Sequence, residues 1–138
     1  MKVLFSGSFN PIHEGHLDII LRASNLFEKV YIAISINENK KYLKNIDERY
    51  EETKKQIFLL NLENVYVLKN EGLTIDIAKK YQCNALIRSI RNFEDMDYEF
   101  ELANKNKNLS KELNIETIFL VSNKNFYDLN STKLRKGK

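Results

Sequence analysis

The chain has 138 residues, of which 43% are hydrophobic and 30% are charged, and its formal net charge is +3. This composition is typical of one ordinary globular domain and excludes a disordered chain. So small a net charge does not by itself indicate a nucleic-acid partner. The single cysteine, Cys83, excludes an internal disulfide, and its apolar neighbours indicate a core thiol. No apolar run approaches the ~18 residues of a membrane span, and the N-terminus is not that of a signal peptide, so we expect a cytoplasmic protein.

Short apolar runs rich in β-branched residues predict five buried strands. In chain order they cover Lys2 to Ser6, Val30 to Ile36, Asn64 to Leu68, Ala85 to Arg88 and Thr117 to Val121. Helical patterns lie between them, at residues 15–27, from a cap at Asp47 to about Leu60, from Thr74 to Tyr81, and from Asp95 to about Leu113. In the first helix Leu17, Ile20, Leu21 and Ser24 share one face, and in the last helix Tyr98, Leu102 and Leu109 lie along one side.

The alternation of strands and helices predicts a single α/β domain over residues 1–138, with a five-stranded parallel sheet and helices on both faces. Sheets of this kind bind ligands beyond the carboxyl ends of their strands, where the strand order reverses. The segments that follow the predicted strands are therefore the candidate site. They are residues 7–16, 37–44, 88–91 and 122–132.

The first of these segments has an unusual composition. It contains the only proline, Pro11, two of the four glycines, and both histidines, His13 and His16, which flank Gly15 at the start of a predicted helix. A helix N-terminus presents unpaired N–H groups and a partial positive charge, and histidines there can donate hydrogen bonds to phosphate oxygens. Capping and zinc binding are the alternatives; no third histidine supports zinc. The pattern favours a phosphate site.

Two further segments carry groups that suit phosphates. Arg88 closes the fourth strand and Arg91 lies three residues on, so both can point into one crevice, where guanidinium groups can hold phosphates in a forked geometry. A carboxylate at Glu99 is unexpected beside phosphates unless it orients a ribose, an arginine or a base. Near the C-terminus, Ser131 and Thr132 precede a predicted helix and can form a further phosphate cradle, although such residues often serve only as caps.

These segments together resemble a known family. Residues His13–His16 are similar to the H-x-G-H or T-x-G-H motif of the nucleotidyltransferase superfamily. Arg88–Arg91, followed by Asp97–Glu99, Leu102, Ala103 and Asn106, resembles the R-G-L-R…D-x-x-Y-E…L-A…N stretch of phosphopantetheine adenylyltransferases. Residues 126–135 resemble the superfamily's I-S-S-T-x-x-R motif. The resemblance covers the whole chain and implies a Rossmann-like nucleotidyltransferase fold. It differs at Ser89, which stands where the family usually has glycine.

The resemblance implies an enzyme that transfers adenylyl from ATP to 4′-phosphopantetheine, with Mg²⁺, in coenzyme A biosynthesis. The implied catalytic residues are His16, Lys40 and Arg91. The implied acceptor-binding residues are Ser8, Lys40, Thr74 and Arg88. The implied ATP-binding residues are Ser8, Phe9, His16, Ser89, Ile90, Arg91, Glu99, Phe126, Tyr127, Asp128, Leu129, Asn130, Ser131 and Thr132. No residue is expected to be a dedicated metal ligand, and no nucleic acid or membrane partner is expected.

The same resemblance bears on assembly and leaves other functions open. The family forms a hexamer with help from helices beyond the third motif, and the chain ends soon after this motif, so a homo-oligomer is implied but not its size. Nicotinate mononucleotide adenylyltransferases and glycerol-phosphate cytidylyltransferases share the first motif but not the second. A non-catalytic nucleotide-binding module remains a third alternative, which pyrophosphate release would distinguish.

Overall fold

The computed structural model describes residues 1–36 and 45–123. The strands of this part are β1 (Lys2–Gly7), β2 (Lys29–Ser35), β3 (Val65–Asn70), β4 (Ala85–Ile90) and β5 (Glu116–Val121). The helices are α1 (Glu14–Leu26), α2 (Ile46–Phe58), α3 (Thr74–Lys80) and α4 (Phe93–Ser110), and a short 3₁₀ helix, η1 (Lys111–Leu113), follows α4. Every strand pair is parallel, which confirms the predicted α/β class and the five-stranded sheet.

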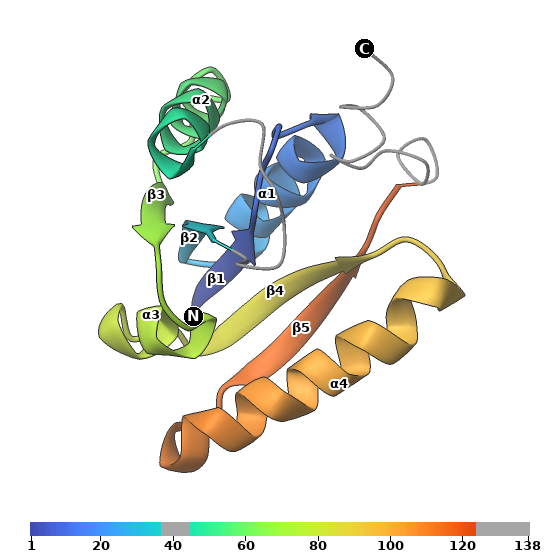
Figure 1. Cartoon of the computed structure of the whole chain (residues 1–138). Helices are drawn as coiled ribbons and strands as arrows, with labels where there is room; N and C mark the ends of the chain where they lie inside the picture. Colours follow the sequence, from blue (N-terminus) through green and yellow to red (C-terminus); the bar gives the residue numbers. More distant parts are fainter. Residues whose placement is uncertain (37–44, 124–138) are drawn as a thin grey trace.

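Helices cover both faces of the sheet, as expected from the alternating pattern. Helices α1 and α2 lie on one face, and α3 and α4 lie on the other (Figure 1). Successive side chains of a strand point to opposite faces. In β1, Val3 and Phe5 therefore pack with Ile19 and Ile20 of α1, whereas Leu4 packs with Ile75 of α3. Two apolar cores result, one on each side of the sheet.

The strand order places the reversal point of the sheet beside β1. The order is β3-β2-β1-β4-β5, so the chain winds outward from β1 to β3 and then crosses back to β4 on the other side of β1. Val3 lies opposite Ala85 and Phe5 opposite Ile87, which brings the carboxyl ends of β1 and β4 together. These are the ends where the sequence places its histidine and arginine motifs. The order reverses here, as the ligand-binding rule for open α/β sheets requires.

Two helices begin at residues other than those expected. The N-cap of α2 is Asn45, whose side-chain oxygen accepts the N–H of Glu48 at 2.9 Å, and not Asp47. Asp47 lies in the first helical turn and pairs with Lys69 of β3. Helix α4 is likewise capped by Asn92 and begins at Phe93, before the expected Asp95. Asparagine is as good an N-cap as aspartate, so residue type alone could not decide between adjacent candidates.

The inner faces of α1 and α4 also differ from the prediction. In α1 the buried residues are Ile19, Ile20 and Ala23, whereas Leu21 is 41% exposed. In α4, Tyr98 is 62% exposed, so the apolar side of this helix lies partly in solvent. The buried residues of α4 are polar, namely Glu99, Asn106 and Ser110. A search for apolar periodicity cannot find such a face.

Two simpler expectations concern Cys83 and membranes. Cys83 is buried in the core beside α3, and burial raises the pKa of its thiol to about 11, which confirms the core thiol. Within residues 1–36 and 45–123, no helix has both the length and the apolar character that crossing a bilayer requires.

Candidate active site

The turn after β1 has an unusual backbone, as its composition suggested. Phe9 has a φ of 46°, in the left-handed region, and the Asn10–Pro11 peptide bond is cis. The Phe9 ring lies over Gly7, where an added Cβ would stand 3.2 Å from a ring carbon. The ring also packs edge-on against His16, with centroids 4.8 Å apart. Gly7 therefore makes room for a buried aromatic support beneath the histidine.

Both histidines cap α1 through their Nδ1 atoms. Nδ1 of His13 accepts the backbone N–H of Gly15 at 3.1 Å, and Nδ1 of His16 accepts the backbone N–H of His13 at 3.1 Å. A nitrogen that accepts a hydrogen bond carries no proton, so in each neutral ring the proton resides on Nε2. The caps thus fix the tautomer and make Nε2 a hydrogen-bond donor. Capping and phosphate binding are compatible here, because they use different ring atoms.

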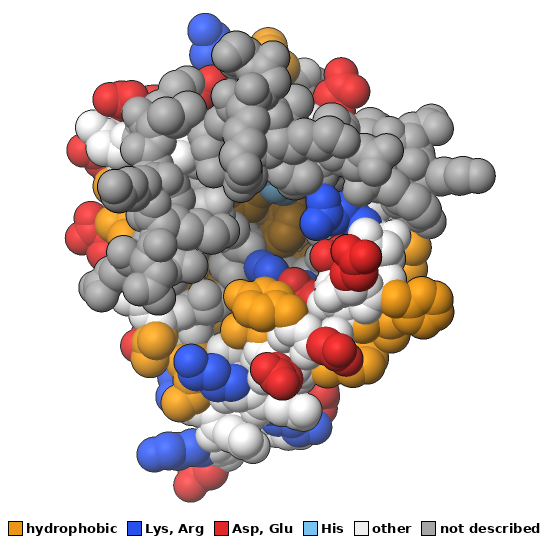
Figure 2. Space-filling model, turned by 45° about the vertical axis from the view of Figure 1, so that its right-hand side comes forward, with side chains coloured by type: hydrophobic (Ala, Val, Ile, Leu, Met, Phe, Trp, Pro, Cys, Tyr) orange, Lys and Arg blue, Asp and Glu red, His pale blue; other side chains and the backbone are white. Residues whose placement is uncertain are grey.

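The environment keeps both imidazoles neutral. Burial, and to a lesser degree the charge of Arg91, lowers the pKa of His13 to about 4. Burial, followed by the charges of His13, Arg91 and Arg88, lowers the pKa of His16 well below its usual 6.5. The two rings stack with their centroids 3.7 Å apart, so a charge on one ring would disfavour a charge on the other. A histidine side chain is visible in a hollow of the surface beside blue basic side chains (Figure 2).

These pKa shifts predict a loss of stability in mild acid. Unfolded histidines titrate near 6.5, so between about pH 6.5 and 4 the unfolded chain binds more protons than the folded one. The free energy of unfolding should therefore fall as the pH drops through this window. Urea unfolding at pH 7 and pH 5 tests this. The matched control is the double variant His13→Asn and His16→Asn, which keeps acceptors near both caps; an equal loss in this variant would exclude the histidines as the cause.

Arg88 is held at the end of β4 by a buried carboxylate. Its Nε and Nη2 donate to the two oxygens of Glu99 at 2.9 and 2.7 Å, and its Nη1 donates to the carbonyl oxygen of Ser6 in β1 at 3.1 Å. Glu99 is 5% exposed. Of the three tasks considered for Glu99, orienting a ribose, an arginine or a base, these contacts favour the arginine.

Arg91 has a second carboxylate partner on the same helix. The Asp95 carboxylate accepts the backbone N–H of Arg91 at 3.0 Å, its Nε–H at 3.3 Å and its Nη2–H at 3.4 Å. Both Arg88 and Arg91 are close enough to His16 to lower its pKa. The structure therefore brings the first and second motifs together at the reversal point of the sheet.

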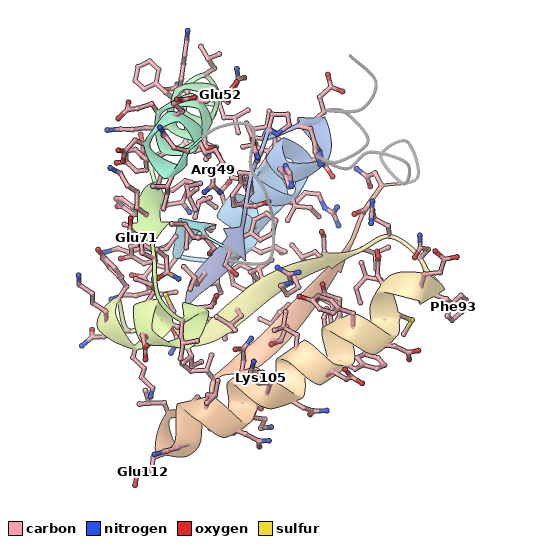
Figure 3. All side chains as sticks on the ribbon, in the orientation of Figure 1. Arg49, Glu52, Glu71, Phe93, Lys105 and Glu112 are labelled. Atoms are coloured by element: carbon pink, nitrogen blue, oxygen red, sulfur yellow. The ribbon has the colours of Figure 1, made fainter. Side chains whose placement is uncertain are left out.

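A third arginine, Arg49, ties the strand ends from the other side. It is 1% exposed, and its Nη1 donates to the carbonyl oxygens of Ser8 at 2.7 Å and Ser35 at 2.9 Å. Figure 3 shows it between α2 and the sheet. It thus holds the loop after β1 against the end of β2. This role is structural and supports the site without facing a ligand.

Comparison with known proteins agrees with this geometry. A family model described as Cytidylyltransferase-like matches residues 4–137. The phosphopantetheine adenylyltransferase of Prochlorococcus marinus subsp. pastoris is 40% identical over 135 residues, which cover 98% of this chain and 82% of that protein. That of Pelagibacter ubique is 43% identical over 122 residues, covering 86% and 73% of the two chains. The chain belongs to the phosphopantetheine adenylyltransferase family. Members of this family are nucleotidyltransferases, which confirms the expected enzyme class.

Solved structures of other adenylyltransferases share the fold of this chain. A bifunctional NMN adenylyltransferase/ADP ribose pyrophosphatase from Francisella tularensis superposes with a TM-score of 0.69 at 19% identity, covering 99% of this chain and 41% of that chain. A putative nicotinate-nucleotide adenylyltransferase from Vibrio parahaemolyticus gives 0.62 at 19% identity, covering 99% and 84%. At this identity the match establishes the Rossmann-like nucleotidyltransferase fold alone.

The remaining predicted site residues are placed as follows. Ser8 and Phe9 lie in the loop after β1, Ser89 and Ile90 end β4, and Thr74 is the first residue of α3. Phe9 is only 2% exposed and packs against His16, so it supports the site from within the core. Lys40 and residues 126–132 lie outside the described residues, and their assignments stay predictions.

Sequence reasoning did not single out Asp95. Its spacing was a usable signal, because side chains four residues apart meet on a helix surface and the pair Arg91 and Asp95 has this separation.

Sequence reasoning also did not identify the group formed by Asp18, Arg22 and Asn123. There the carboxylate of Asp18 accepts from both partners, and Arg22 also donates to the carbonyl oxygen of Val121. This group joins α1 to the end of β5.

Proposed function

We propose that this chain transfers the adenylyl group of ATP to 4′-phosphopantetheine, giving dephospho-coenzyme A and pyrophosphate. The observation that carries the proposal is the neutral imidazole of His16, protonated on Nε2, beside Arg88 and Arg91 at the reversal point of the sheet. Membership of the phosphopantetheine adenylyltransferase family supports the choice of acceptor. The reaction would be a step of coenzyme A biosynthesis in the cytoplasm, where ATP is abundant.

The reaction needs no general base. An oxygen of the acceptor phosphate, already anionic at pH 7, attacks the α-phosphorus of ATP and forms a new P–O bond. The bond between this phosphorus and the oxygen bridging to the β-phosphate breaks, and pyrophosphate leaves with the electron pair. Catalysis then depends on holding two polyanions in line and stabilising charge on the α-phosphate. A neutral N–H donor such as His16 can do this without taking part in proton transfer.

Each side chain has one task in this scheme. His16 would donate from Nε2 to the α-phosphate in the transition state. Arg88, Lys40 and Ser8 would hold the acceptor phosphate, and Thr74 would contact the pantetheine arm. Arg91, Ser131 and Thr132 would hold the phosphates of ATP. The nucleotide site would further involve Phe9, Ser89, Ile90, Glu99 and residues 126–130.

The charges of the described groups suit a metal–nucleotide complex. Two guanidinium groups face two carboxylates and the imidazoles are neutral, so these groups add no net positive charge to offset a triphosphate. Within the described part of the chain, no three His, Cys, Asp or Glu side chains form a group that could hold a metal ion. Mg²⁺ fits such a site when the phosphates of ATP supply most of its ligands, and it would neutralise phosphate charge there.

A homo-oligomer is part of the proposal. Several large apolar side chains on α4 and β5 are exposed, among them Phe93, which is 88% exposed and points away from the body at the start of α4 (Figure 3). Light scattering coupled to size-exclusion chromatography measures the assembly directly.

Pyrophosphate release with Mg-ATP and three acceptors tests the proposal. We expect release with 4′-phosphopantetheine and none above background with nicotinate mononucleotide or glycerol 3-phosphate, because the arginine motif matches the phosphopantetheine branch. The control omits the acceptor, which measures simple hydrolysis of ATP. Release with another acceptor would replace the proposed substrate. ATP binding without release for any acceptor would indicate a binding module.

A further inference from the structure

Helix α4 presents two carboxylates, one turn apart, to two arginines at the end of β4. Glu99 contacts Nε and Nη2 of Arg88, and Asp95 contacts Nε and Nη2 of Arg91. In both pairs the carboxylate contacts the edge of the guanidinium group that carries Nε and Nη2. Residues four apart on a helix lie on one face, so a single rigid element sets the orientation of both arginines.

Asp95 is itself well anchored. Besides the guanidinium, its carboxylate accepts the backbone N–H of Arg91 at 3.0 Å, and its own backbone N–H donates to the Asn92 side chain at 3.2 Å. Its side chain is only 23% exposed. Although partial burial by itself raises the pKa of Asp95, the hydrogen bonds and charge of Arg91 outweigh it and lower the pKa below its usual value. Asp95 is therefore ionised at neutral pH and fixed relative to the backbone of Arg91.

The held edge determines which donors of the guanidinium can meet a ligand. A guanidinium carries five N–H groups, and those of Nη1 and one of Nη2 form a second edge that matches two phosphate oxygens. In both pairs the carboxylate occupies the Nε edge, so the contact with α4 does not use the second edge, although Nη1 of Arg88 also donates to the carbonyl oxygen of Ser6. We propose that Asp95 is a positioning residue that directs the Nη edge of Arg91 toward the phosphates of the nucleotide.

The competing explanation is that the ion pair between Arg91 and Asp95 only stabilises the fold. A partly exposed ion pair contributes little to stability, and a purely structural role would leave ATP binding unchanged when the carboxylate of Asp95 is removed. The positioning role instead predicts a specific effect on ATP. Because the role rests on the proposed function, ATP binding by the wild-type protein is measured first and by itself.

The test compares ATP affinity in Asp95→Asn with that of the wild type by calorimetry. Asparagine keeps an acceptor for the backbone N–H of Arg91 but cannot hold both guanidinium nitrogens. We expect the Kd for ATP to rise about tenfold, since a small misplacement of a binding group is costly, while the KM for 4′-phosphopantetheine changes less than twofold. Glu101→Gln, which removes an exposed carboxylate from the same helix, should leave both constants unchanged. An unchanged Kd in Asp95→Asn would overturn the role.

A double-mutant comparison separates positioning from a general loss of fold. In an Arg91→Ala background, Asp95→Asn should no longer weaken ATP binding, because no guanidinium remains to be oriented. The same weakening in both backgrounds would overturn the proposal. Arg91→Lys offers a second route that leaves Asp95 intact: a single ammonium cannot form the fork, so a rise in Kd similar to that of Asp95→Asn is expected, and wild-type affinity would contradict the proposal. If the wild type itself binds no ATP, the proposed function fails; ATP binding that is insensitive to Asp95 overturns only this inference.

Discussion

Turnover is expected to fall about 10²- to 10³-fold when His16 is replaced by alanine, because a donor to the charge that develops on the α-phosphate is lost. The same change removes an acceptor from the cap of α1 and a ring from the packing around Phe9. Some loss of stability should therefore accompany the loss of activity. Steady-state kinetics of pyrophosphate release, together with a thermal unfolding curve, measure the two effects separately.

Two amide variants separate the donor from the cap. His16→Asn keeps a polar atom near the position of Nδ1 and loses the donor at Nε2, so it should be stable and nearly inactive. His16→Gln places an amide N–H near the position of Nε2 and loses the cap, so it should be less stable but more active than the asparagine variant. The opposite order of activities would show that His16 acts only by capping α1. Turnover of His16→Ala within a few-fold of wild type would remove it from the mechanism.

Glu99→Gln is expected to have the largest combined effect on stability and substrate binding. Arg88, whose side chain is 25% exposed, would lose the buried carboxylate that balances its charge, and breaking such a pair costs up to about 3 kcal/mol. Since Arg88 is the proposed ligand of the acceptor phosphate, the KM for 4′-phosphopantetheine should rise at least tenfold, and the KM for ATP should rise by a smaller factor. Urea unfolding and kinetics with each substrate varied in turn measure both. Asp97→Asn, an exposed neighbour on α4, is the matched control.

An apolar double variant separates two contributions to stability. One is the cost of leaving Arg88 without its carboxylate, and the other is the net contribution of the ion pair itself. Arg88→Met together with Glu99→Leu removes both charges, and such replacements are often neutral for stability. We expect this variant to unfold near the wild-type urea concentration while binding of the acceptor remains lost. If stability stays low in the double variant, packing rather than charge would explain the loss in Glu99→Gln. If acceptor binding recovers, Arg88 is not its ligand.

Local patterns in the sequence were sufficient for the fold class and for the location of the site. The five apolar runs became the five parallel strands, because β-branched runs bounded by polar segments are a property of neighbouring residues. The histidines, the glycine between them and the nearby proline identified the loop after β1, because such residues are rarely gathered without a backbone reason. Arg88, within β4, and Arg91, just after it, were placed beside this loop by the crossover rule for parallel strands alone.

Contacts between distant segments decided the rest. Whether Glu99 faces a nucleotide or an arginine depends on how α4 packs on β4, and the same packing leaves Tyr98 in solvent. Arg88 also donates to the carbonyl oxygen of Ser6 in β1, which lies 82 residues away in the sequence. The neutral state of His16 likewise arises from burial and from charges brought in by β4 and α4. Orientation, protonation and choice of partner depend on side chains that meet only in the folded chain, so they could not be derived from residue type and spacing.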